Sequence, residues 1–133
     1  MGRHLLDVDD LGADGLERVL EHARWLGALS RSDAFGRLLG RTVVNLFYEP
    51  STRTRVSFEV AARRLGAEVV NISATGSSVE KGETLIDTMR TLEAAGADAL
   101  VVRHSSAGAP YLLARSASGS VINAGDGLHA HPT

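Results

Sequence analysis

Short strand-like runs alternate with helical patterns along most of this chain, and this alternation limits the possible folds more than any other feature. Apolar or β-branched runs of strand length occupy residues 41–47, 68–72, 99–102 and 121–123. Helical patterns separate them, beginning near Val56, Leu85 and Pro110. Alternation of this kind produces a parallel sheet with right-handed crossovers. We therefore predict an α/β fold with a four-stranded, or slightly larger, parallel sheet and helices on both faces.

A further helix precedes the first strand. Asp14 and Glu17 have the spacing of a capping box. Apolar residues recur behind them at helical intervals: Leu16, Val19, Leu20, Ala23, Leu26 and Leu29. This pattern predicts an amphipathic helix of about four turns, with its apolar side in the core and not at a partner surface.

The composition narrows the class of protein. A chain of 133 residues with 44% apolar residues can form one domain with a proper core. Fourteen basic and 16 acidic residues give a net charge of −2, and only 5% are aromatic, so nucleic acid is not an expected partner. The absence of cysteine excludes disulfides and cysteine-ligated zinc. Without a signal peptide or an apolar spanning run, we expect a cytoplasmic protein with no membrane contact.

Polar segments follow all four predicted strands. They occupy residues 51–55, 73–81, 103–104 and 123–131. In open parallel sheets of the Rossmann-like or flavodoxin-like kind, ligands bind outside the carboxyl ends of the strands, where the strand order reverses. We therefore expect these four segments to converge on one crevice.

Residues 51–55 read Ser-Thr-Arg-Thr-Arg and lie where a strand leads into a helix. Unpaired amides and the positive end of the helix dipole favour an anion at such a place. Arg53 and Arg55 add forked donors suited to phosphate or carboxylate. Alternatively, Ser51 or Thr52 caps the helix and both arginines are solvated. The segment alone leaves both interpretations open.

Arg103 and His131 are further candidates at the same edge. Arg103 follows a buried strand, so its charge should emerge at the crevice unless it pairs with a neighbouring acid. His129 and His131 lack a third ligand, so we predict no metal site. An imidazole that donates to a substrate oxygen suits a cationic site better.

Several motifs of other enzyme classes are missing from the sequence. It has no P-loop, no G-x-G-x-x-G fingerprint and no nucleophile elbow, which disfavours nucleotide cofactors and covalent catalysis. The candidate residues instead favour a site that binds an anion and stabilises negative charge on a carbonyl oxygen. Acyl or carbamoyl transfer needs no more than that, and it needs no cofactor.

Residues 47–59, FYEPSTRTRVSFE, resemble the carbamoyl phosphate signature of the transcarbamoylases. Three further stretches narrow the match: KGET at 81–84 with DT at 87–88, VRH at 102–104, and NAGDG at 123–127 with HPT at 131–133. Together they resemble the catalytic chains of the aspartate-specific members. Ornithine-specific members typically carry cysteine after the His-Pro pair, where this chain has Thr133.

The resemblance implies roles for the matching residues. The phosphate of carbamoyl phosphate would be bound by Ser51, Thr52, Arg53 and Thr54. Arg103 would bridge the phosphate and the carbonyl oxygen. Thr54 and His131 would donate to that oxygen while the amine of L-aspartate attacks the carbon. The tetrahedral intermediate would then lose phosphate without a covalent enzyme intermediate.

The resemblance also implies an assembly and a second domain. Ser77 and Lys81 match loop residues that reach a neighbouring subunit's site, where Lys81 contacts aspartate, so the full-length form would be a homotrimer. Regulatory or dihydroorotase-like subunits are candidate partners of such a trimer. Residues 1–133 would be the carbamoyl phosphate-binding domain, with the aspartate-binding domain absent from this chain. In the alternative, the isolated chain binds carbamoyl phosphate or phosphate without turnover.

Overall fold

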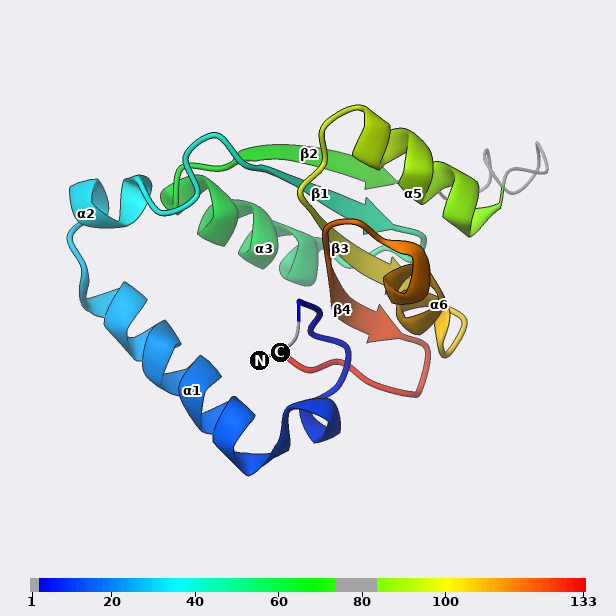
Figure 1. The fold of residues 1–133 in the computed structure, drawn as a ribbon, viewed down its shortest axis with the longest axis horizontal. Coiled ribbons are helices and arrows are strands. Elements are labelled where there is room, and N and C mark those ends of the chain that lie inside the picture. The colour runs from blue at the N-terminus through cyan, green and yellow to red at the C-terminus, as the bar shows by residue number, and fades with distance from the viewer. Residues whose placement is uncertain (1–2, 74–83) are drawn as a thin grey trace.

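Four parallel strands form the central sheet of the computed structural model, which describes residues 3–73 and 84–133 (Figure 1). The strands are β1 (Thr42–Phe47), β2 (Glu68–Ser73), β3 (Ala99–His104) and β4 (Ser120–Asp126). Their order is β2-β1-β3-β4, so the direction of strand addition reverses between β1 and β3. This is the beginning of the flavodoxin-like order. The predicted fold class is confirmed.

The helices are α1 (Val8–Ala28), α2 (Arg31–Phe35), α3 (Thr52–Arg64), α5 (Leu85–Ala94) and α6 (Ala109–Ser116). Of these, α3 packs on one face of the sheet, and α5 and α6 pack on the other. Because side chains alternate along a strand, β1 contributes to two separate cores. Leu46 packs in one cluster with Met89 of α5 and Leu113 of α6. Phe47 packs in the other with Ala62 of α3. Within the described ranges, no helix is both long and apolar enough to cross a membrane.

The first helix differs from its prediction in two ways. It begins at Val8, where the Asp7 carboxylate caps it by accepting from the Asp9 amide at 3.4 Å, and it is kinked at Gly12 (φ 67°). Gly12 is not helical, so a second helical part begins directly after it, close to the predicted start at Asp14, and only the short part from Val8 was not predicted. The expectation that its apolar side lies in the core was wrong. Leu20 is 48% exposed, and α1 lies apart from the sheet (Figure 1).

Several element boundaries also differ. The third helix begins at Thr52, before the predicted Val56, and the short helix α2 was not predicted. Strand β3 extends through His104 and β4 through Asp126, because their ladder continues to the pair His104 and Asp126. The polar residues expected to follow these strands are thus partly inside them.

Two glycines end helices in the same way but in different surroundings. Gly66 (φ 91°) follows α3, and Gly96 (φ 114°) follows α5. The next amide, of Ala67 or Ala97, donates back to the last turn of its helix at 3.0 Å in both cases. A Cβ on Gly66 would overlap the carbonyl oxygen of Phe35, whereas a Cβ on Gly96 would meet nothing within 4 Å.

We expect Gly66→Ala to destabilise the chain far more than Gly96→Ala. Both substitutions force an L-residue into left-handed backbone, at a cost of about 1 kcal/mol. Only Gly66→Ala adds a clash with neighbouring backbone, worth roughly 1–3 kcal/mol more. Urea denaturation of the two variants measures this difference. Equal losses of unfolding free energy would show that the carbonyl of Phe35 in α2 is not held close to Gly66 in solution.

Candidate functional site

Side chains that follow β1 and β4 line one cavity of about 390 Å³. Its walls are formed by Arg53, Thr54, Ser57, Phe58, Ala61, His131 and Thr133. The cavity therefore brings together three residues that the sequence analysis selected from two distant segments. It lies beside the first turn of α3, at the edge where the carboxyl ends of parallel strands meet.

The first turn of α3 is left open by its N-cap residue. Ser51 has extended backbone and makes no side-chain capping bond. Its hydroxyl instead donates to Thr54 Oγ1 at 3.0 Å. Thr52, the first helical residue, is exposed, and no acidic residue occupies the first turn. Capping by the Ser51 side chain is thus excluded. The backbone amides of the first turn, together with the positive end of the helix dipole, remain suited to an anion.

The two arginines of this segment have different surroundings. Arg55 Nη1 forms an ion pair with Glu59 Oε1 at 3.1 Å. Hydrogen bonds from Asn71 and then from Arg63 lower the pKa of Glu59, so this carboxylate stays charged and keeps its partners. Arg55 therefore belongs to a surface network that joins α3 to β2. Arg53 lines the cavity instead.

Arg103 lies inside β3 and reaches across to β4. Its Nη1 donates to the carbonyl of Ala124 at 2.8 Å, and its Nε is buried without a hydrogen-bond partner among the described residues. The alternative in the sequence analysis was that Arg103 pairs with a neighbouring acid. Across residues 3–73 and 84–133, no such ion pair of Arg103 is present. Gly125 makes this approach possible, because a Cβ there would lie 2.5 Å from Nη1. The same Cβ would lie 3.6 Å from Cδ2 of His131, so both side chains flank Gly125.

His131 is held neutral more readily than an ordinary histidine. Partial burial and then the Arg103 guanidinium lower its pKa. Its Nδ1 lies 3.1 Å from the hydroxyl of Thr133. When Thr133 donates to Nδ1, the proton of the neutral ring is on Nε2. In that tautomer, His131 can donate a hydrogen bond from Nε2 without adding a charge.

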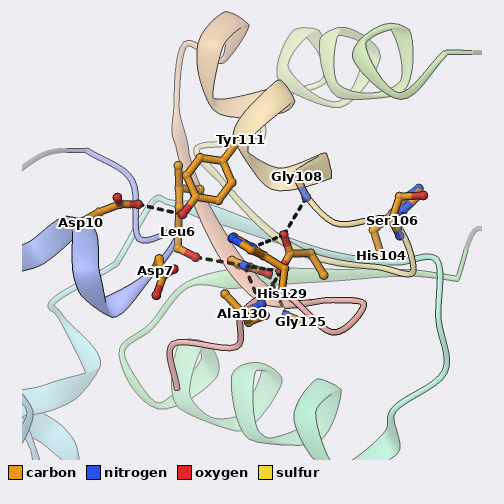
Figure 2. Close-up of polar contacts among 12 residues, drawn as sticks. Leu6, Asp7, Asp10, His104, Ser106, Gly108, Tyr111, Gly125, His129 and Ala130 are labelled. Atoms are coloured by element: carbon orange, nitrogen blue, oxygen red, sulfur yellow. Dashed lines mark hydrogen bonds and ion pairs between the residues drawn. The ribbon is translucent and has the colours of Figure 1, made fainter.

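Asp126 was not selected from the sequence, although it is wholly buried at the end of β4. Its Oδ1 accepts from the Ala130 amide at 2.8 Å and from Asn123 Nδ2 at 3.1 Å. Its Oδ2 accepts from the Gly108 amide at 2.8 Å and lies 2.9 Å from His129 Nδ1. Figure 2 shows these contacts meeting between α6 and the segment after β4. We call Asp126 and these four partners the Asp126 clasp.

The sequence did contain one signal that could have indicated a role for Asp126, namely the two glycines, Gly125 and Gly127, that flank it. A single acid between glycines directly after an apolar strand fits a buried carboxylate that needs close backbone donors. The backbone donors themselves are the amides of residues 108 and 130, which no sequence pattern connects to Asp126.

The remaining predicted residues fall into two groups. Ser77 and Lys81 lie outside the described residues. His129 and His131 do not face a common centre: His129 contacts Asp126, while His131 contacts Thr133. Within the part of the chain that the structure describes, no three His, Asp or Glu side chains cluster as metal ligands would.

Comparison with known families gives one match over nearly the whole chain. The family model described as aspartate/ornithine carbamoyltransferase, carbamoyl-P binding domain, matches residues 3–133. The aspartate carbamoyltransferase catalytic subunit of Roseiflexus castenholzii is 57% identical over 138 residues, covering 98% of this chain and 42% of that protein. The catalytic subunit of Chloroflexus aurantiacus is 59% identical over 133 residues, covering 98% and 43%. The chain thus spans less than half the length of these curated relatives.

Solved structures agree with the sequence comparison. The catalytic subunit of M. jannaschii aspartate transcarbamoylase superposes with a TM-score of 0.89 at 41% identity, covering 98% of this chain and 43% of that one. Aspartate transcarbamoylase from Trypanosoma cruzi, in complex with carbamoyl phosphate and aspartate, gives a TM-score of 0.81 at 35% identity. That match covers 95% of this chain and 39% of the other.

We expect the stability contributed by Asp126 to disappear in acid. Burial alone would raise its pKa, but hydrogen bonds led by those from Gly108 and Asn123 lower it below the ordinary 3.8. The unfolded chain then binds the proton first, so this stability is present above 3.8 and is lost as pH falls through the folded value.

Urea denaturation between about pH 7 and about pH 3 measures this effect. Asp126→Asn should be less stable than the original chain at neutral pH, and the gap should narrow as the pH falls. A gap that is constant over this range would contradict a charged Asp126 in the folded state.

Proposed function

We propose a function from the premise that this chain belongs to the aspartate/ornithine carbamoyltransferase family, as its carbamoyl-P binding domain. The proposed reaction of the complete protein transfers the carbamoyl group from carbamoyl phosphate to the amine of L-aspartate. The products are N-carbamoyl-L-aspartate and phosphate, a step of pyrimidine biosynthesis, in the cytoplasm. The observation that carries the proposal is the cavity shared by Arg53, Thr54 and His131, with Arg103 beside it.

The phosphate end of the substrate would bind at the start of α3. Ser51, Thr52 and Thr54 supply hydroxyls there, and Arg53 supplies a guanidinium at the cavity wall. Uncapped amides and the helix dipole favour the same negative charge. Forked guanidinium contacts also fix the orientation of a phosphate, so one end of the substrate would be held while the other reacts.

The carbonyl end would lie toward Arg103 and His131. The lone pair of the aspartate amine attacks the carbamoyl carbon, and the C=O π electrons move to the oxygen. Arg103, the Thr54 hydroxyl and His131 would stabilise that oxyanion, which is where charge develops. The tetrahedral intermediate then reforms C=O and breaks the bond to phosphate oxygen, while the amine loses a proton to the departing phosphate or to water. No residue of the chain becomes covalently attached.

The aspartate end requires groups outside the described residues. We propose that Lys81 and Ser77 act in the site of a neighbouring subunit, that Lys81 contacts aspartate, and that the complete protein is a homotrimer. A second domain, beyond the carbamoyl phosphate-binding domain of residues 1–133, would complete the aspartate site. Regulatory or dihydroorotase-like subunits remain candidate partners. These proposals rest on the family resemblance stated in the sequence analysis, including the match of Ser77 and Lys81.

The isolated chain supports a second, narrower function. It spans 42% of the Roseiflexus castenholzii relative, yet it contains the whole cavity described above. We propose that this chain alone binds carbamoyl phosphate or phosphate without turnover. Formation of carbamoyl aspartate by the purified chain would contradict this narrower function and would leave the full reaction supported.

Arg53→Ala should weaken phosphate binding by about 1.5 kcal/mol or more, the order of one charge-assisted hydrogen bond. The reason is the loss of the guanidinium from the cavity wall, while α3 keeps its length. Titration calorimetry of the isolated chain with inorganic phosphate and with carbamoyl phosphate measures the change.

Arg63→Ala is the matched control, because Arg63 lies on the same helix, pairs with Glu59 at 3.1 Å and does not line the cavity. It should leave both affinities unchanged. Unchanged affinity in Arg53→Ala would remove Arg53 from the site.

A shared active site predicts complementation in the full-length protein. Lys81→Ala and Arg53→Ala homotrimers should each be nearly inactive, because each site needs Arg53 from one subunit and Lys81 from its neighbour. Hybrid trimers of the two variants contain some sites with both residues intact. Activity should therefore reappear in purified hybrids, and its failure to do so would argue that each site belongs to one subunit.

A further inference from the structure

We propose that Asp126 is a positioning residue: its buried carboxylate fixes the backbone that presents His131 to the carbonyl oxygen of carbamoyl phosphate. The inference rests on the proposed function and adds to it a residue with no direct contact to the substrate. It is carried by the geometry of the Asp126 clasp, in which main-chain groups from two elements end on one side chain (Figure 2).

The clasp holds both polar groups of the residue that precedes His131. The Ala130 amide donates to Asp126 Oδ1 at 2.8 Å. The Ala130 carbonyl accepts from the Asp126 amide at 3.1 Å and from Asn123 Nδ2 at 3.4 Å. With both its amide and its carbonyl bound to β4, Ala130 has little freedom to rotate. The direction in which the chain enters His131 is therefore set by Asp126 and Asn123.

The clasp also joins the segment of His131 to the segment that follows Arg103. Asp126 Oδ2 accepts from the Gly108 amide, at the start of α6. The Gly127 amide donates to the His104 carbonyl at 2.9 Å, next to Arg103 in the chain. The two groups proposed to meet the carbonyl oxygen, Arg103 and His131, are thus held relative to each other through Asp126 and its neighbours.

The chemistry of the clasp requires a carboxylate. Three of the atoms that contact Asp126, the Gly108 and Ala130 backbone nitrogens and Asn123 Nδ2, can only donate, and Asn123 Oδ1 already accepts from the Gly125 amide. The three donors approach both oxygens of Asp126. An asparagine of equal size offers one oxygen and one NH₂ group, so at least one backbone donor would face another donor. Asp126→Asn therefore disturbs the clasp while preserving the volume of the side chain.

A purely structural role makes a different prediction from a positioning role. A general loss of order at the sheet edge would weaken phosphate and carbamoyl phosphate alike. Misplacement of His131 would weaken only the ligand that has a carbonyl oxygen, because Arg53 and the start of α3 would still bind the phosphate group. The ratio of the two affinities therefore separates the roles.

The test measures binding of inorganic phosphate and of carbamoyl phosphate to the isolated chain by titration calorimetry. Asp126→Asn should lose about fivefold in affinity for carbamoyl phosphate, the size of one hydrogen bond, with little change for phosphate. His131→Ala should show the same selective loss. The double variant should lose no more than either single variant, because both act through one contact.

Asp98→Asn is the matched control. Asp98 accepts from the Thr42 amide at 2.8 Å at the opposite end of the sheet, so its loss should affect stability and neither affinity. Equal losses for the two ligands in Asp126→Asn, or additive losses in the double variant, would overturn the positioning role. Failure of the original chain to bind either ligand would instead overturn the proposed function.

If Asp126→Asn does not fold, hydrogen exchange of the original chain decides the matter. The Gly108 and Ala130 amides should exchange at least about tenfold more slowly than in an unstructured chain, since both donate to a buried acceptor. Exchange of Ala130 at the unstructured rate would show that the backbone before His131 is not held, and would overturn the proposal.

Discussion

The pairing of β1 with β3 is the constraint on which the rest of the site depends. Phe47 is in register with Arg103, and the Tyr48 amide extends the ladder by donating to the Arg103 carbonyl at 2.8 Å. After these neighbouring strands the chain turns to opposite faces, to α3 after β1 and to α6 after β3. The cavity of Arg53 and His131 lies beside α3 at this edge, and Arg103 lies next to it because it flanks Gly125 together with His131.

Buried polar side chains differ in how fully their hydrogen-bonding groups are satisfied. Asp126 and Asn123 are fully buried and have their polar atoms engaged, which fixes the segment after β4. Asn45, also fully buried in β1, donates to Asn71 but leaves its own Oδ1 without a partner among the described residues. Since an unmet buried acceptor costs free energy, well-satisfied polar clusters specify one geometry more strongly than partly satisfied ones. The segment that leads to His131 is therefore more strongly specified by its polar contacts than the contact of Asn45 with Asn71.

Much of this architecture could be predicted from the sequence, and the failures have physical causes. The strand and helix alternation was sufficient for the fold class, because both faces of a parallel sheet need apolar cover. The ends of β3 and β4 were missed because Arg103 and Asp126 resemble loop residues, while ladder pairing with neighbours keeps them in strands. The exposed side of α1 was missed because periodicity shows which face is apolar and not whether anything covers it. Asp126 was missed because no sequence pattern links it to its donors, of which Ala130 belongs to an irregular segment and Gly108 to a different connection.

The proposed site uses two kinds of side chain, charged arginines for binding the phosphate group and a neutral histidine for stabilising the carbonyl oxygen. In the proposed reaction, the fixed positive charge of Arg53 and Arg103 would attract the phosphate group in the ground state and in the transition state alike, which strengthens binding more than it speeds reaction. His131 is different, because partial burial and the neighbouring Arg103 lower its pKa and keep the ring neutral. A neutral donor interacts weakly with an uncharged carbonyl and more strongly as that oxygen becomes negative. In the proposed reaction, the neutral His131 would therefore contribute to binding through one hydrogen bond and contribute more as the transition state forms.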